Sequence, residues 1–249
     1  SLVPPLIAWS ALAIFILGLH TVTQVQIWSS STLLSIHHIN AHPQSVRANT
    51  DMATRLAELG DFKAALEFSS AGFAASQTQK AARTERDGDF RLRNVALACM
   101  AGDPVPVEEL SRFGLTHPER PAADTNTLEV LVALQRDTRC PKFAWEMVAD
   151  RMREVYLLDP TPSRASVGIY RTLAVLMNNL SRLEDGRQYA QLGLLQAEDD
   201  VPLLFMRLHF AKLGSETELV SDLVRRLQAL EQRGRLSARD SQNLSLYVP

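Results

Sequence analysis

An apolar run at the start of the chain constrains the fold more than any other feature of the sequence. Residues 6–25 contain no Asp, Glu, Lys or Arg, and a helix needs about 20 such residues to cross a hydrocarbon core at about 1.5 Å per residue. Trp9 and Trp28 lie near the two ends of the run, where membrane proteins place aromatic side chains. A Pro-Pro pair precedes the run, where a helix can begin. We therefore expect a transmembrane helix over residues 1–26.

Two alternatives to a transmembrane helix are weaker. A signal peptide needs a basic segment before the apolar run and a small-residue cleavage site after it, and the sequence shows neither. A buried core helix of a soluble protein is seldom so uniformly apolar. No Lys or Arg follows the run before Arg47, so charge does not set the orientation of the span. The missing initiator Met and basic flank favour the C-terminal portion of a longer, multi-spanning protein.

The rest of the chain has the pattern of an all-α protein. Apolar residues recur every three or four positions rather than every two, and helix breakers separate the segments at regular intervals. Hydrophobic residues make up 46% of the chain and charged residues 22%, which is typical of a folded domain. The formal net charge is −2. We expect no nucleic-acid partner, because phosphate recognition needs concentrated positive charge.

The clearest unit after the membrane segment is a helix–turn–helix over residues 45–77. Ser45 can cap the first helix through its side-chain oxygen. Gly60 can end this helix in the left-handed conformation that glycine adopts without strain. Asp61 then stands where it can cap the second helix.

This unit resembles a tetratricopeptide repeat. Ala53 and Ala65 are small enough for two antiparallel helices to approach closely, and Phe62 fills the space beside them. With Gly60, these residues stand at the small, turn, aromatic and small positions of that family's helix–turn–helix unit of about 34 residues. Pro43 stands where the closing proline of a preceding repeat belongs. The resemblance implies a right-handed solenoid of helix pairs.

Four further helix pairs are predicted by the same periodicity. Their first helices are expected to begin near residues 87, 121, 163 and 201. In the fourth pair overall, Gly186, Tyr189 and Gly193 take the small, aromatic and small positions of the second helix. Degenerate repeats of this kind stack so that each pair buries its apolar face against its neighbours.

The predicted organisation joins this solenoid to the membrane without a break. No breaker stands between Gln24 and Pro43, so we expect the membrane helix to continue helically out of the bilayer. The predicted parts are a transmembrane helix (1–26), a linking helix packing as a half-repeat (27–44), a degenerate tetratricopeptide-like solenoid of about five pairs (45–236) and a C-terminal tail (237–249).

The junction between membrane and repeats carries a second resemblance. A tryptophan, a Leu-Leu pair and the sequence His-Pro-x-Ser-x-Arg-Ala follow one another over residues 28–48. This order is similar to that in multi-spanning membrane proteins with C-terminal tetratricopeptide repeats, such as bacterial relatives of the transmembrane-and-tetratricopeptide mannosyltransferase-like family. The resemblance covers residues 1–77. It implies that any catalytic residues lie upstream, in membrane-domain loops.

Three histidines near the junction are the first candidates for chemistry. His38 and His42 are four residues apart, so on a helix their imidazoles share a face that could hold zinc or copper. A site needs three or four ligands, and the nearest acidic residue, Asp51, lies beyond Pro43. We therefore expect polar side chains at a helix end, with His37 beside them, and no metal.

Cys99 and Cys140 are the only cysteines of the chain. In the predicted solenoid they belong to adjacent helix pairs, so they could form a disulfide if the domain faces an oxidising compartment. The alternative is two separate buried thiols that behave as small apolar side chains. We expect no catalytic role for either, since His117 is the only histidine between them.

Acidic side chains and known motifs give no catalytic centre. The pairs Glu108-Glu109 and Glu184-Asp185 stand in first helical turns, where negative charge complements the helix dipole. Residues 198–200 are expected to form a solvated acidic loop. The sequence contains no phosphate-binding glycine loop, His-Glu-x-x-His, Gly-x-Ser-x-Gly or Cys-x-x-Cys motif. We expect no cofactor and, within this chain, no catalysis.

The predicted shape is the remaining functional feature. First helices of such a solenoid line a concave groove that binds an extended peptide or a helix of another protein. Arginine and asparagine side chains there could bind a partner's backbone or carboxylates, although each could equally be a solvated surface residue. The candidates on the first two of these helices are Arg47, Asn49, Arg55, Arg91, Arg93 and Asn94.

Three functions agree with these features. The favoured one is a membrane-anchored scaffold that mediates protein–protein interaction. The alternatives are the substrate-presenting C-terminal region of a multi-spanning glycosyltransferase that uses lipid-linked sugars, and a single-span assembly factor of a pilus or secretion machine. The family resemblance and the cysteine pair favour the bacterial inner membrane, with the soluble domain in the periplasm.

Overall fold

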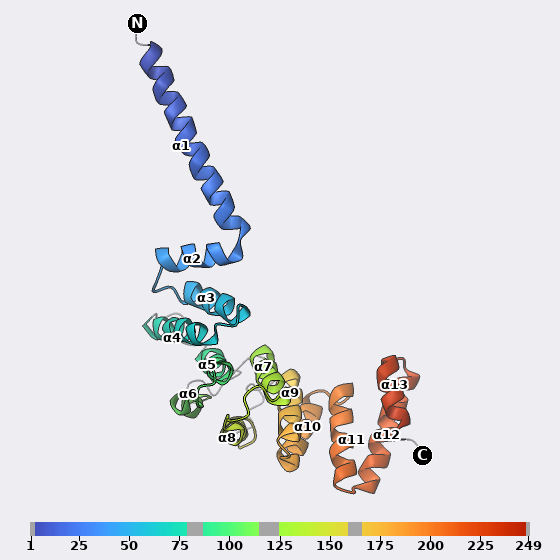
Figure 1. Cartoon of the computed structure of the whole chain (residues 1–249). Coiled ribbons are helices and arrows are strands. Elements are labelled where there is room, and N and C mark those ends of the chain that lie inside the picture. The colour runs from blue at the N-terminus through green and yellow to red at the C-terminus, as the bar shows by residue number, and fades with distance from the viewer. Residues whose placement is uncertain (1–2, 79–86, 115–124, 159–165, 248–249) are drawn as a thin grey trace. The chain divides into compact units, whose positions relative to one another are not determined.

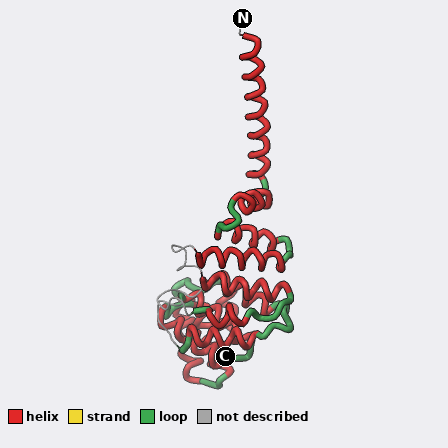
Figure 2. The backbone as a smooth tube through the Cα atoms, turned by 90° about the vertical axis from the view of Figure 1, so that its left-hand side faces the viewer, coloured by secondary structure: helices red, strands yellow, loops and turns green. Residues whose placement is uncertain are grey.

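The computed structural model describes residues 3–78, 87–114, 125–158 and 166–247. Regular structure in these residues is helical throughout, with thirteen helices and no strand (Figures 1 and 2). The prediction of an all-α chain is confirmed. The helices are α1 (Val3–Ser29), α2 (Ser31–Ala41), α3 (Val46–Glu58), α4 (Phe62–Thr78), α5 (Asp87–Ala101), α6 (Val107–Arg112), α7 (Thr125–Arg136), α8 (Trp145–Tyr156), α9 (Val167–Asn179), α10 (Leu183–Gln196), α11 (Val201–Leu213), α12 (Thr217–Gln232) and α13 (Ala238–Ser245).

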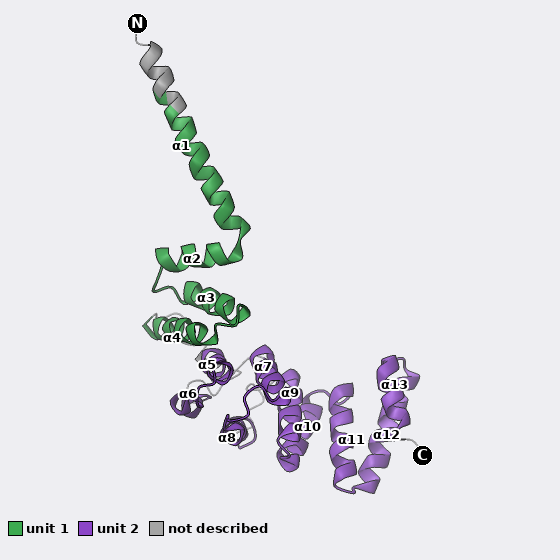
Figure 3. Ribbon diagram, viewed as in Figure 1, with its two compact units in different colours: residues 1–80 green, residues 81–249 purple. Residues whose placement is uncertain are grey.

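The chain divides into two compact units, residues 1–80 and residues 81–249 (Figure 3). The first unit holds α1 to α4, and the second holds α5 to α13. The predicted helix starts near residues 121 and 163, and the position of His117, lie outside the described residues.

The first helix is long, apolar and exposed. Its segment Leu12–Ser29 has a mean hydropathy of 1.3 and no buried side chain, and by length and composition it is able to cross a membrane, as a signal sequence near an N-terminus also is. Phe15 is 65% exposed and Leu17 is 63% exposed, so the alternative of a buried core helix is wrong for the described residues. The hydroxyl of Thr21 donates to the carbonyl of Leu17 at 2.8 Å, which satisfies that polar group without water.

The predicted continuous helix from the membrane segment to Pro43 is wrong. α1 ends at Ser29, and α2 begins at Ser31. Between them Ser30 is extended, with φ −123° and ψ 116°, and its hydroxyl accepts a hydrogen bond from the N–H of Leu33. Serine side chains compete with the backbone in this way, which favours a helix cap over a helix interior. The break therefore comes from a serine rather than from a proline or glycine.

The helix pair α3 and α4 follows the local signals of the sequence. The hydroxyl of Ser45 accepts from the N–H of Ala48 at 3.3 Å, and a carboxylate oxygen of Asp61 accepts from the N–H of Ala64 at 3.1 Å. Gly60 between the two helices has φ +83°, which L-residues other than glycine adopt only at a cost. The two predicted caps and the predicted glycine turn are thus confirmed.

Close packing of α3 on α4 uses the small residues predicted for it. Ala53 is 1% exposed and Ala65 is fully buried, and the two helices pack along their length. The other face of α3 receives α2, which packs on it. The predicted packing of the linking segment against the first pair therefore holds for α2.

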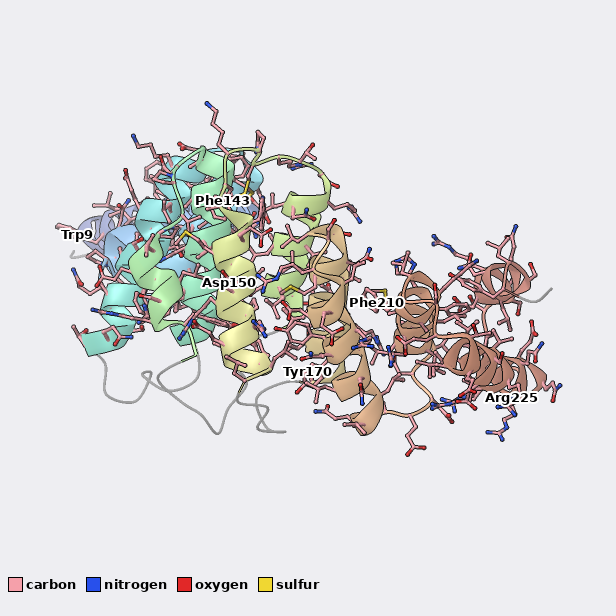
Figure 4. All side chains as sticks on the ribbon, turned by 90° about the horizontal axis from the view of Figure 1, so that it is seen from below. Trp9, Phe143, Asp150, Tyr170, Phe210 and Arg225 are labelled. Atoms are coloured by element: carbon pink, nitrogen blue, oxygen red, sulfur yellow. A yellow bond between two sulfur atoms is a disulfide. The ribbon has the colours of Figure 1, made fainter. Side chains whose placement is uncertain are left out.

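Alternate helices of the second unit pack side by side. α7 contacts both α5 and α9, and α9 contacts α11, while α10 packs against α9 and α11. The spaces between these helices are filled by buried side chains, among them Tyr170 and Phe210 (Figure 4). Gly186 and Gly193 on α10 lie at close approaches: a Cβ on Gly193 would stand 2.5 Å from a methyl carbon of Leu203.

The end of the second unit is ordered where the sequence predicted a tail. α13 packs on α12 and buries Leu244, which is 2% exposed. Ser237 and Asp240 form a capping box at its start, with each side chain accepting from the other's backbone N–H. Such a box satisfies two N–H groups at once, and with the buried leucine it explains why residues 238–245 form a helix.

Candidate binding groove

A groove with a volume of about 400 Å³ lies across α7, α9 and α11. This volume falls in the range of sites that take small ligands or a few side chains. Three helices that are separated along the chain contribute to its lining. The lining residues are Glu129, Val132, Ala133 and Arg136 of α7, Arg171, Thr172 and Val175 of α9, and Pro202 and Met206 of α11.

Helical periodicity brings these residues to the groove. On α7 the lining positions are spaced by three, one and three residues, on α9 by one and three, and on α11 by four. Such spacings keep side chains on one face of a helix. Because α7, α9 and α11 lie in a row, their three faces form one continuous surface.

The floor of the groove is mainly apolar. Val132 is 9% exposed and Thr172 is 6% exposed, while Val175 and Met206 are half-buried. The hydroxyl of Thr172 donates to the carbonyl of Gly168 at 2.9 Å, so its polarity is satisfied within α9. The floor therefore offers a bound molecule apolar contact area.

Ion pairs already hold both arginines at the rim. Arg171 pairs with Asp200 through Nε at 2.9 Å and through a second nitrogen. The hydrogen bond from Arg171 to that carboxylate raises the pKa of the guanidinium above its ordinary value, although burial opposes the shift. Arg136 Nε lies 3.0 Å from a carboxylate oxygen of Asp137. Each arginine thus already has a carboxylate of the same chain beside it.

Glu129 is the charged groove residue that remains available. It is exposed, and it forms no ion pair within the described part of the chain. The groove thus combines an apolar floor, two neutralised arginines and one free carboxylate. A carboxylate beside apolar surface suits a ligand that carries an apolar side chain next to a basic one.

The acidic loop of residues 198–200 borders the groove and is not simply solvated, as the sequence predicted. Asp199 pairs with Arg235 at 2.8 Å, and the carbonyl of Glu198 accepts from Arg226 at 2.7 Å. Asp200 pairs with Arg171. Arginines from three places in the chain thus hold this loop, two through the carboxylates of Asp199 and Asp200 and one through the backbone carbonyl of Glu198.

Three of the six residues predicted to line a groove are buried instead. Asn49 is 2% exposed, and its amide donates to the carbonyls of Pro43 at 2.8 Å and Ser45 at 2.9 Å. Arg91 is 6% exposed and pairs with Glu109 at 2.8 Å; Asn94 is 2% exposed. These three side chains thus lie inside the fold rather than on an exposed groove. The Asn49 amide and one terminal nitrogen of Arg91 are engaged by groups of the same chain.

The other three predicted residues lie nearer the surface, and each has a neighbour in its own helix. Arg47 is exposed and lies 3.7 Å from Asp51. Arg55 pairs with Glu58 at 2.5 Å. The guanidinium of Arg93 stands over the ring of Phe90 at 5.6 Å from its centroid. None of the six predicted residues lines the groove on α7, α9 and α11.

Cys99 and Cys140 are joined by a disulfide in the structure, with their Cα atoms 5.5 Å apart. Cys99 lies on α5, Cys140 follows α7, and both are buried. The bond links α5 to the segment that follows α7, and α5 and α7 also pack on each other. It therefore ties together the start of the row of helices that carries the groove.

The histidines of the junction lie on and just after α2. The N–H of His42 donates to the carbonyl of His38 at 2.9 Å and ends the helix. In the described residues, no three side chains of His, Cys, Asp or Glu come together as a metal site would require.

An arginine network links α8 to α10 where the sequence predicted only a helix-dipole role for Asp185. Arg182 lies 2.7 Å from Asp185 and 2.5 Å from Asp150, and Arg153 lies 3.2 Å from Asp185. Burial alone would lower the pKa of Arg182, but its hydrogen bonds to Asp150 and Asp185 outweigh burial and raise it. These ion pairs fasten α8 and α10 together, a role that no local pattern could reveal.

No protein-family model matches this chain, and no curated protein matches it. The groove and the helices that form it therefore carry the functional conclusion.

Proposed function

We propose that this chain is a membrane-anchored scaffold that binds an extended segment of a partner protein in the groove across α7, α9 and α11. The observation that carries the proposal is the groove itself, with its continuous, mainly apolar floor made by three alternate helices. Packed helices lie about 8–10 Å apart, so two such intervals span roughly 16–20 Å. An extended segment of about five or six residues covers that distance.

The order of helix packing supports a tetratricopeptide-like solenoid as the framework of this groove. α5, α7, α9 and α11 follow one another in a row, and α10 packs against two of them. In a solenoid of helix pairs, the first helices form one such row and line the face that binds partners. The close approaches at Gly186 and Gly193 support the same framework, because pairs of this kind need small residues where helices meet.

The chemistry of the groove defines the partner segment more narrowly than the sequence did. The sequence favoured arginine and asparagine side chains that bind the backbone or carboxylates of a partner. Arg136 and Arg171 are held by Asp137 and Asp200, whereas Glu129 is available. The preferred segment therefore carries an apolar side chain for the floor and a lysine or arginine for Glu129.

The proposed location is the bacterial inner membrane, with the helices after α1 in the periplasm. Two observations support it. α1 is apolar and exposed, as an anchor must be, and the disulfide between Cys99 and Cys140 suits an oxidising compartment. In the glycosyltransferase alternative the same groove would belong to a larger enzyme and present its protein substrate. In the assembly-factor alternative it would bind a component of a pilus or secretion machine.

The test is selection of binding peptides on the full chain, followed by variants that fill the groove. The chain in lipid nanodiscs is used to select peptides of six to eight residues from a displayed library, and their affinities are then measured. Ala133→Trp places an indole in the groove, so we expect affinity to fall at least about tenfold, which corresponds to about 1.4 kcal/mol. Glu129→Gln should weaken those peptides that carry a basic residue.

Leu195→Trp is the matched control for this test. Leu195 is 74% exposed on α10 and does not line the groove, so its replacement adds the same indole elsewhere. Peptides that bind the Ala133→Trp and Leu195→Trp variants equally well would place the binding surface outside the groove and refute the proposal.

A further inference from the structure

The helix α2 has two different faces. Ser35 and Ile39 are buried, at 5% and 9% exposure, on the helix that packs against α3. Leu33 and Ile36 are exposed, at 47% and 39%, and their spacing of three residues puts them together on another face. Leu33 and Ile36 thus form a small exposed apolar patch on this helix.

The exposed face continues the apolar surface of α1. Within the first unit, the helices follow in the order α1, α2, α3 and α4, so that α2 lies between α1 and α3 (Figures 1 and 2). The face of α2 that is turned away from α3 is therefore on the side of α1. Trp28, in the last turn of α1, is 68% exposed, and only the break at Ser30 separates it from α2.

The composition of α2 favours a partner that makes apolar contacts over one that recognises charge. The helix contains no Asp, Glu, Lys or Arg, and the first such residue after α1 is Arg47. Its exposed face is apolar near α1, at Leu33 and Ile36, and turns polar toward the other end at His37 and Asn40. A partner that recognises charge would find little on this face, whereas the boundary between lipid headgroups and acyl chains accepts such a mixture.

We infer that α2 lies along the membrane surface, with Leu33 and Ile36 inserted at the boundary between headgroups and acyl chains. This inference rests on the proposed role of α1 as a membrane anchor. Trp28 then stands at the interface, where tryptophan is favoured, and the break at Ser30 turns the chain from the bilayer into its surface. A second copy of the chain is a poorer occupant, because two side chains offer far less than the roughly 800 Å² per partner of a stable interface.

The consequence is a fixed attachment of the repeats to the membrane. Because α3 packs on the buried face of α2, an α2 seated in the surface holds the α3–α4 pair beside the bilayer. A flexible tether would leave that pair free to turn. The α3–α4 pair thus gains a defined position relative to the lipid, because one face of α2 contacts the membrane and the opposite face contacts α3.

The experiment measures where individual side chains sit. Single cysteines replace Leu33, Ile36, Leu59 and Ile14 in the full chain, whose native cysteines are bonded to each other. Each variant receives a nitroxide label in phosphatidylcholine nanodiscs, and collision with oxygen is compared with collision with a water-soluble nickel complex. Leu59 is the aqueous control, because it is 71% exposed at the end of α3; Ile14 reports on α1.

We expect the labels at positions 33 and 36 to favour oxygen over nickel several-fold more than the label at position 59. Equal ratios at positions 33, 36 and 59 would overturn the inference, as would labels at 33 and 36 that neither reagent reaches, because a protein neighbour would then cover them. If the label at position 14 favours oxygen while those at positions 33 and 36 favour nickel, only this inference is overturned. If the label at position 14 also favours nickel, the proposed membrane anchor is overturned as well.

Discussion

Arg171 on α9 forms a two-point ion pair with Asp200, and the same carboxylate caps α11 by accepting from the N–H of Leu203 at 3.0 Å. One side chain therefore fastens α9 to the first turn of α11 at the rim of the groove. The side chain of Asp200 is only 7% exposed, so water cannot replace both partners at once. This relationship makes the shape of the groove depend on a single acidic residue.

Asp200→Ala should loosen the start of α11. Loss of a helix cap costs about 1 kcal/mol, and the hydrogen bonds to Arg171 add to this, so we expect a local loss of about 1–2 kcal/mol. Hydrogen exchange of the Leu203 amide measures the effect directly. Asp199→Ala is the control, because Asp199 is 47% exposed and its ion pair with Arg235 should contribute less than about 0.5 kcal/mol. Equal effects of the two variants would contradict the role assigned to Asp200.

The carboxyl of Glu184 gives a prediction about pH. Hydrogen bonds from Arg187 and Gln188 lower its pKa below the ordinary value of 4.5. Because the folded pKa lies below the unfolded one, this carboxylate adds stability above the unfolded pKa, and the contribution is lost as pH falls through the folded pKa. Glu184 is 59% exposed, so the contribution should stay below about 0.5 kcal/mol. Replacing Arg187 with Gln should move the pKa back up in a carbon-detected NMR titration.

A matched variant separates this local effect from general charge. Arg225→Gln removes the same charge from α12, where Arg225 pairs with Asp222. It should leave the titration of Glu184 unchanged. A shift of equal size in both variants would mean that net charge, rather than the hydrogen bond from Arg187, lowers the pKa.

Removing the disulfide should cost stability throughout the second unit. Cys99 and Cys140 are separated by 41 positions, and closing a loop of that length removes about 4 kcal/mol of chain entropy from the unfolded state, with measured values more often about 2–4 kcal/mol. We expect a loss in that range for the double replacement of both cysteines by alanine, followed by urea unfolding of the full chain in detergent. Reductant should shift the midpoint of the native chain and leave that of the variant unchanged. Reaction of the native cysteines with a thiol reagent before reduction would contradict the bond.

The parts of the fold that depend on neighbouring residues were predictable from the sequence. Ser45, Gly60 and Asp61 act through atoms within a few positions of themselves, so their pattern predicts the α3–α4 turn without knowledge of anything distant. The break at Ser30 was also local, but serine is a weaker signal than proline or glycine. A serine can cap a helix or lie inside one, and at Ser30 the hydrogen bond accepted from the N–H of Leu33 makes it a cap.

The residues that line the groove could not be predicted, because they depend on which helices lie side by side and which side chains pair there. In the sequence, a polar residue on a helix looks the same whether its side chain faces solvent or pairs with a residue elsewhere in the chain. Arg91 finds Glu109 eighteen positions away, and Arg171 finds Asp200 twenty-nine positions away. Only the tertiary packing decides that the first is buried and that the second borders a groove.

Gly193 tests the packing of α10 between its neighbours. A Cβ there would stand 2.5 Å from a methyl carbon of Leu203 and 3.1 Å from Cβ of Tyr170. Gly193→Val should therefore destabilise the fold by more than about 2 kcal/mol, because overpacking outweighs the gain in helix propensity. Gln191→Val, at an exposed position of the same helix, should change the urea midpoint little. A Gly193→Val chain as stable as the Gln191→Val control would show that the helices are not packed this closely.

A substitution at Asn49 distinguishes a structural role from a binding role for this residue of α3. Its buried amide donates to the carbonyls of Pro43 and Ser45, and leaving such groups unsatisfied costs about 1–3 kcal/mol. Asn49→Ala should lower the unfolding free energy of the full chain by that amount and leave the affinity for groove-binding peptides unchanged. Arg47→Ala, whose side chain is 87% exposed, should alter neither quantity. A variant at position 49 that kept its stability but lost peptide affinity would instead support Asn49 as a partner-binding residue.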